Sequence, residues 1–88
     1  MPIISQFYGI LVKMFFNDKG KHHLKHIHIE YAEYTATFDF NGNMLTGNIP
    51  KKQKSMVEAW IAIHQEELEA LWKTINEDNG FFKIEPLR

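Results

Sequence analysis

The sequence predicts an α+β fold, in which an antiparallel sheet of about four strands carries one long C-terminal helix on one face. Residues 26–31 and 34–40 alternate between apolar and polar side chains, and this period of two is typical of strands with one buried face. Residues 57–75 instead place apolar side chains three and four positions apart, which indicates an amphipathic helix. At 88 residues, the chain is expected to form a single domain, residues 1–88.

The first predicted strand covers residues 7–16, a run that is rich in β-branched and aromatic side chains. Its nearly continuous hydrophobicity favours a central place in the sheet, with Gly9 as the site of a β-bulge. Residues 17–20, with the sequence Asn-Asp-Lys-Gly, are turn formers and are expected to end this strand.

The second predicted strand covers residues 26–31 and buries Ile27 and Ile29 on one face. Its opposite face carries three polar side chains in a row: His26, His28 and Glu30.

A third strand over residues 34–40 leads to Asn41-Gly42, which predicts a type I′ hairpin turn because both central residues of that turn need a positive φ. A short fourth strand over residues 44–46 follows. A meander is the simplest topology for these strands.

The predicted helix follows Pro50, which favours a first-turn position, and Ser55 to Glu58 match a capping box. One apolar face then extends over about six turns. We expect it to cover the sheet face opposite the histidines. This apolar face of the helix comprises Val57, Trp60, Ile61, His64, Leu68, Leu71, Trp72 and Ile75.

The pattern leaves open whether the helix is continuous. A kink or break near His64 and Gln65 would fit, because so long a helix would overhang a four-stranded sheet. His64 itself is interpreted as a buried, hydrogen-bonded histidine rather than a ligand, and the two tryptophans as core residues. Asn79-Gly80 ends the helix, and residues 81–85 are a candidate for a last edge strand.

The composition excludes several classes of function. The chain has no cysteine, so disulfides, thiolate zinc sites and cysteine nucleophiles are excluded. It also lacks a run of about 18 apolar residues, a signal-peptide pattern, a glycine-rich phosphate loop and a nucleophile elbow. We therefore expect a cytoplasmic protein that does not depend on nucleotide cofactors and is not a serine hydrolase.

Charge is unevenly distributed along the chain. Residues 1–54 have a net charge of +3 and residues 55–88 of -4, which together give the overall -1. The positive charge gathers near the histidines and at Lys51, Lys52 and Lys54. RNA is a conceivable anionic ligand there, although nucleic-acid-binding proteins are usually more basic, and solvated lysines are the simpler interpretation.

Four of the five histidines lie between positions 22 and 28, and imidazole serves as acid, base or metal ligand near neutral pH. His26 and His28 share one face of a strand, about 6–7 Å apart along the chain. They are candidate ligands of a divalent transition metal such as zinc, together with His22 and His23 from the preceding loop. Glu30 would complete the shell or orient an imidazole.

The same residues allow three other interpretations. His26 and His28 could act as general acid and base in RNA cleavage, supported by Glu30 and by a cation, Lys25 or Lys21. The cluster could instead be a surface that binds an acidic protein partner, or simply a set of polar residues on an exposed strand and loop.

Several spaced blocks of sequence occur in a fixed order along the chain. They are Met1-Pro2-x-Ile4-Ser5-x-Phe7-x-Gly9-Ile10, His22-His23-x-x-His26-Ile27-His28, Gly47-x-Ile49-Pro50, Val57-x-Ala59-Trp60-Ile61-x-Ile63-His64-x-x-Glu67-Leu68 with Trp72, and Phe82-Lys83-Ile84-Glu85-Pro86-Leu87. Together these blocks resemble the bacterial family called domain of unknown function 4160, and the resemblance covers essentially the whole chain.

The resemblance implies a bacterial, cytosolic protein that is often encoded beside another small protein, in pairs that look like toxin–antitoxin modules. A toxin-like component acting through the histidine-rich face is therefore one expectation, with a small neighbouring gene product as partner. The alternative is a non-enzymatic module that binds a metal or a protein through the same cluster, and self-association stays open. The family pattern has proline where this chain has Lys25.

Overall fold

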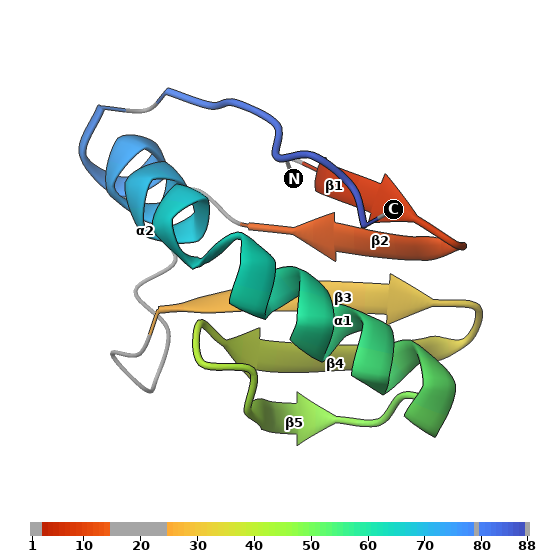
Figure 1. The fold of residues 1–88 in the computed structure, drawn as a ribbon. Coiled ribbons are helices and arrows are strands. Elements are labelled where there is room, and N and C mark those ends of the chain that lie inside the picture. The colour runs from red at the N-terminus through yellow and green to blue at the C-terminus, as the bar shows by residue number, and fades with distance from the viewer. Residues whose placement is uncertain (1–2, 15–24, 79, 88) are drawn as a thin grey trace.

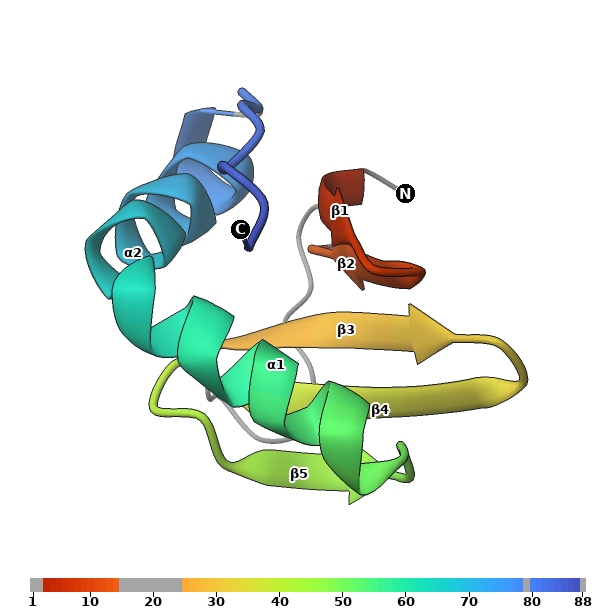
Figure 2. The same ribbon diagram turned by 45° about the vertical axis from the view of Figure 1, so that its right-hand side comes forward.

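The computed structural model describes residues 3–14, 25–78 and 80–87 and has an α+β fold, as predicted. One antiparallel sheet has the strand order β1-β2-β3-β4-β5, so the predicted meander is confirmed. The helices lie on one face of this sheet (Figure 1 and Figure 2). The elements are β1 (Ile3–Phe7), β2 (Ile10–Lys13), β3 (His26–Tyr31), β4 (Tyr34–Asp39), β5 (Met44–Gly47), α1 (Lys51–Ile63), α2 (Gln65–Lys73) and the π-helical turn η1 (Thr74–Asp78).

The prediction of four strands is wrong, because a tight turn divides the apolar run at the start of the chain. Tyr8 and Gly9 have φ angles of 48° and 80°, which is the left-handed pair that a type I′ hairpin requires. Gly9 is therefore a turn residue rather than a bulge, and β1 forms a fifth strand. The end of the predicted first strand, at residues 15–16, and the turn at 17–20 lie outside the described residues.

The strands β3, β4 and β5 lie within one residue of their predicted bounds, but the turn between β4 and β5 differs from the prediction. The backbone N–H of Asp39 donates to the carbonyl of Asn43 at 2.9 Å, and that of Gly42 donates to the carbonyl of Asp39 at 3.3 Å. Of Asn41 and Gly42, only Gly42 has a positive φ, of 91°. The connection is thus a three-residue loop with a glycine bulge instead of a type I′ turn.

The side chain of Asp39 holds this loop together. Its Oδ1 accepts hydrogen bonds from the backbone N–H groups of Asn41 and Asn43, both at 2.9 Å. Partial burial raises the pKa of the Asp39 carboxyl, but these bonds, with one from the Asn43 side chain, outweigh burial and lower that pKa below its ordinary value. The loop therefore favours the ionised carboxylate.

We expect the Asp39→Asn variant to depend less on pH for its stability than the wild type. A carboxyl whose pKa is lowered in the folded state stabilises the fold above its unfolded pKa, and this contribution is lost as the pH falls through the folded value. Urea unfolding at about pH 7 and about pH 3 would measure, for both proteins, the loss of unfolding free energy between the two pH values. An equal loss in the two proteins would show that Asp39 does not contribute.

The one long helix that the sequence predicts is divided into α1 and α2 at His64, where the sequence leaves a kink or break open. His64 has φ -112° and ψ 24°, outside the helical region. The side-chain amide of Gln65 then donates to the carbonyl of Phe40 at 2.9 Å and ties the start of α2 to the sheet. At its other end α1 begins at Lys51, so Ser55 lies inside the helix rather than at a capping box.

His64 is buried, as predicted, with 9% of its surface exposed. Its Nδ1 lies 2.6 Å from Oε1 of Glu67, and its ring centroid lies 5.3 Å from that of Trp60. The hydrogen-bond partner of His64 thus lies on α2 itself. His64 therefore stabilises the joint between the two helices.

One hydrophobic core fills the space between the sheet and the helices, and Trp60, Phe38, Ile27 and Ile29 are among its fully buried members. The predicted edge strand at residues 81–85 is not formed. The segment nevertheless lies along β1, because the N–H of Ile84 donates to the carbonyl of Ile4 at 2.8 Å (Figure 1).

Candidate functional site

The face of the sheet opposite the helices carries polar side chains in rows. The antiparallel register aligns Lys13, His28, Thr37 and Thr46 across β2, β3, β4 and β5, and side chains in register point to the same face. None of the described helices or strands lies over this face (Figure 2). We call it the open face, and its polar side chains are those of Lys13, His26, His28, Glu30, Thr35, Thr37, Asp39 and Thr46.

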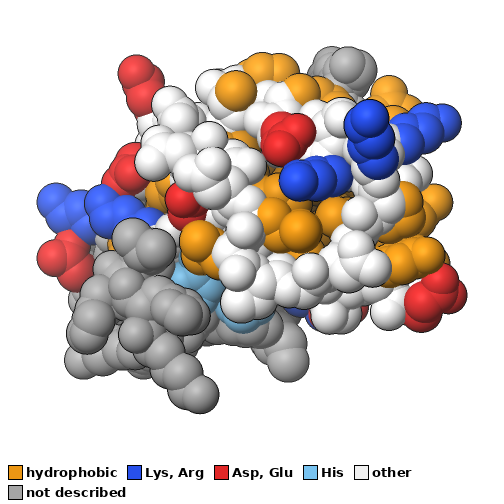
Figure 3. Space-filling view, turned by 90° about the horizontal axis from the view of Figure 1, so that it is seen from below, with side chains coloured by type: hydrophobic (Ala, Val, Ile, Leu, Met, Phe, Trp, Pro, Cys, Tyr) orange, Lys and Arg blue, Asp and Glu red, His pale blue; other side chains and the backbone are white. Residues whose placement is uncertain are grey.

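The two predicted histidines lie together on the open face. The ring centroids of His26 and His28 are 5.1 Å apart, and the rings meet edge to face at 64°. Both side chains are partly exposed, and Figure 3 shows histidine side chains at the molecular surface. The strand geometry predicted from the alternation is therefore present, and it brings two imidazoles within reach of one bound group.

His26 also contacts the end of α2. Its ring centroid lies 5.6 Å from that of Trp72, and the Trp72 ring in turn meets Phe40 at 5.9 Å. Trp72, which the sequence assigns to the core, is only partly buried. These contacts fix the position of the His26 ring, whereas His28 lies nearer the middle of the sheet.

A cation that the sequence does not point to lies beside the histidines. Lys13 stands opposite His28 in the β2–β3 register, and its Nζ lies 2.6 Å from Oε2 of Glu30. Only 15% of the Lys13 side chain is exposed, so its ammonium is held in place. In β2, Leu11 and Lys13 alternate with Val12, and this alternation places Lys13 on the open face. The apolar residues around Lys13 hide this pattern in the sequence.

The other predicted members of the site are placed differently. Lys25 forms an ion pair with Glu69 of α2 and so is directed toward the helix rather than the histidine pair. Glu30 faces Lys13. Lys21, His22 and His23 lie outside the described residues.

No three histidine, aspartate or glutamate side chains in the described part of the chain are arranged to hold a metal ion. A site that combines His26 and His28 with His22 and His23 therefore stays a prediction. His26 and His28 are the two described residues that would supply ligands to it.

Two hollows adjoin the histidine pair. A small one of about 200 Å³ lies on the open face, and the hydroxyls of Thr37 and Thr46 meet there at 2.7 Å. Its polar side chains are those of His28, Glu30, Thr35, Thr37 and Thr46. It offers hydroxyl donors and acceptors next to an imidazole.

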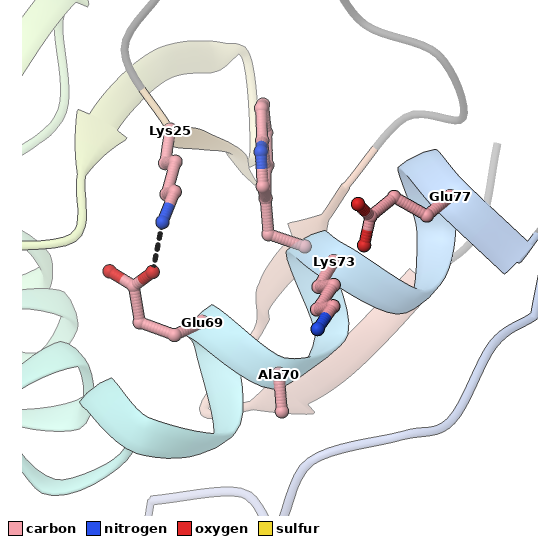
Figure 4. Close-up of a pocket in the computed structure, with 6 residues that line it drawn as sticks. Lys25, Glu69, Ala70, Lys73 and Glu77 are labelled. Carbon is pink, nitrogen blue, oxygen red and sulfur yellow. Dashed lines mark hydrogen bonds and ion pairs between the residues drawn. The ribbon is translucent and has the colours of Figure 1, made fainter.

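The larger hollow, of about 540 Å³, lies between the start of β3 and α2 (Figure 4). Trp72 lines it and also contacts His26, so one aromatic side chain connects this cavity to the open face. The lining residues are Lys25, Glu69, Ala70, Trp72, Lys73 and Glu77.

No described helix is long and apolar enough to cross a bilayer.

Comparison with known proteins identifies the family. No curated protein and no solved structure shows significant similarity to this chain. The model of the family described as a domain of unknown function (DUF4160) matches residues 9–73. The match spans β2 to α2 and includes Lys13, His26, His28 and Trp72. The chain therefore belongs to the DUF4160 family.

Proposed function

We propose that the protein is the toxin-like component of a bacterial two-gene module and that it cleaves RNA through His26 and His28. The observation that carries this proposal is the pair of imidazoles, with ring centroids 5.1 Å apart, on a sheet face that no described element covers. The Lys13 ammonium on the neighbouring strand supports it, since acid–base cleavage of a phosphodiester also needs a nearby positive charge.

The reaction uses the two rings as a proton donor and a proton acceptor. One imidazole removes the proton of the ribose 2′-hydroxyl, and the 2′-oxygen forms a bond to phosphorus. The other ring, as imidazolium, donates its proton to the departing 5′-oxygen as the P–O5′ bond breaks. The products are a 2′,3′-cyclic phosphate and a 5′-hydroxyl, and Lys13 stabilises the negative charge on the phosphoryl oxygens in the transition state.

Growth of a bacterial host under tight induction tests the proposal. We expect the wild type to arrest growth and the His26→Ala, His28→Ala double variant to lose arrest while folding alike, as judged by soluble yield and circular dichroism. A Glu58→Ala, Glu66→Ala double variant is the matched control, because both glutamates are exposed on the helices and lie outside the open face, and it should arrest growth like the wild type. Growth that continues with every folded protein would contradict a toxin-like role.

The alternative is a non-enzymatic module that binds a metal or a partner protein through the same face. It is favoured by the close approach of the two rings, because neutral imidazole nitrogens bind zinc at about 2.0–2.1 Å and adjacent rings can share one ion. This alternative predicts no growth arrest. It predicts instead that zinc content, or capture of the neighbouring gene product, falls in the double histidine variant.

A further inference from the structure

The cavity between β3 and α2 has a combination of groups that the histidine pair does not use. Trp72 and Ala70 supply apolar lining, and two lysines and two glutamates supply charge of both signs. Its volume of about 540 Å³ lies within the range of small-molecule sites, roughly 300–1,000 Å³, and it is open to solvent, because every lining residue except Trp72 is exposed. The cavity therefore suits a planar group whose edge carries both hydrogen-bond donors and acceptors.

The four charged side chains that line the cavity differ in whether they form an ion pair with another described residue. Lys25 and Glu69 satisfy each other in an ion pair on one side. Lys73 and Glu77 make no ion pair within the described part of the chain, and Figure 4 shows the Glu77 carboxylate turned toward the cavity. One carboxylate and one ammonium, four positions apart on the last helical turns, are thus available to a ligand.

We propose that this cavity binds a guanine base of single-stranded RNA. Guanine alone among the four bases has two adjacent N–H donor groups, N1–H and the 2-amino group, which one carboxylate accepts together. Its neighbouring O6 accepts from an ammonium. Glu77 and Lys73 supply these partners, and Trp72 supplies the aromatic surface on which unpaired bases stack.

The position of the cavity connects base recognition to cleavage. Trp72 lines the cavity and contacts His26, with ring centroids 5.6 Å apart, so a base bound there lies one side chain away from the histidine pair. This inference rests on the proposed RNA cleavage for its biological meaning. Binding of the base is nevertheless a separate property that can be measured without any cleavable bond.

Titration with the four nucleoside 5′-monophosphates, followed by NMR of the indole N–H signals, tests the inference. These probes contain no phosphodiester. Guanosine monophosphate should shift the Trp72 signal and bind about tenfold or more tightly than the other three. The buried Trp60 provides an internal reference, because it lies outside the cavity.

The Glu77→Gln variant should lose the preference for guanine, whereas Glu66→Gln, an exposed substitution on α2 outside the cavity, should keep it. Equal affinity for all four nucleotides, an unmoved Trp72 signal, or a preference retained by Glu77→Gln would overturn the inference. Nucleotide binding and RNA cleavage are measured separately. Base binding without RNA cleavage would thus refute the proposed function alone, and cleavage without base preference would refute this inference alone.

Discussion

The Gly47→Ala variant is expected to lose on the order of 3 kcal/mol of folding free energy. Gly47 has a φ of 89°, a conformation that costs any residue with a Cβ atom. A Cβ at this position would also lie 2.2 Å from the carbonyl oxygen of Thr35 and 2.6 Å from Cα of Ala36. Both are backbone atoms of β4, so neither can rotate out of the way, and β5 would have to separate from its neighbour.

Gly42→Ala is the matched control for this prediction. Gly42 has a similar φ of 91°, but a Cβ there would meet nothing within 4 Å. Its substitution should therefore cost only the conformational strain, about 1–2 kcal/mol. Urea unfolding of both variants separates the two effects, and equal losses would mean that the contact with β4 is not what requires glycine at position 47.

Under the proposed mechanism, loss of either imidazole should have the largest effect on RNA cleavage. We expect His26→Ala and His28→Ala each to lower the single-turnover rate of RNA cleavage by about 100-fold to 10,000-fold, the usual range for general acid–base catalysis. Lys13→Gln should lower it by about 100-fold, because it removes a positioned charge while keeping a polar side chain of similar but slightly shorter length.

The control for these rates is Glu58→Gln, an exposed position on α1 that lies on neither the open face nor the cavity. It should cleave at the wild-type rate. A His28→Ala variant that folds and cleaves normally would rule out the acid–base role of the pair.

The sequence predicts the strands that alternate and fails where the pattern is continuous. His26 to Tyr31 shows one apolar and one polar face, so both its bounds and the direction of its side chains follow from the period of two. The turn at Tyr8 and Gly9 lies inside an apolar run, and a tyrosine with a positive φ gives no signal in the sequence. The helix break at His64 is anticipated only from the excess length of the helix.

The candidate site could also be predicted only in part from the sequence. The histidine pair could be predicted because both residues lie on one alternating strand. Lys13 and Trp72 could not, because their places depend on the β2–β3 register and on where α2 passes the end of the sheet. Lys25 is adjacent to the pair in sequence but is held by Glu69, a contact between residues that are 44 positions apart.

The most direct test of the account is incubation of the purified protein with a guanine-containing RNA oligonucleotide and with a copy that carries 2′-deoxyribose on the 5′ side of the cleaved bond. We expect the RNA to yield fragments with a 2′,3′-cyclic phosphate and a 5′-hydroxyl, and the deoxy copy to stay intact at that bond. The 2′-oxygen is the nucleophile in the proposed reaction, so its removal stops the chemistry. Cleavage of both oligonucleotides alike, or of neither, would contradict catalysis by the histidine pair.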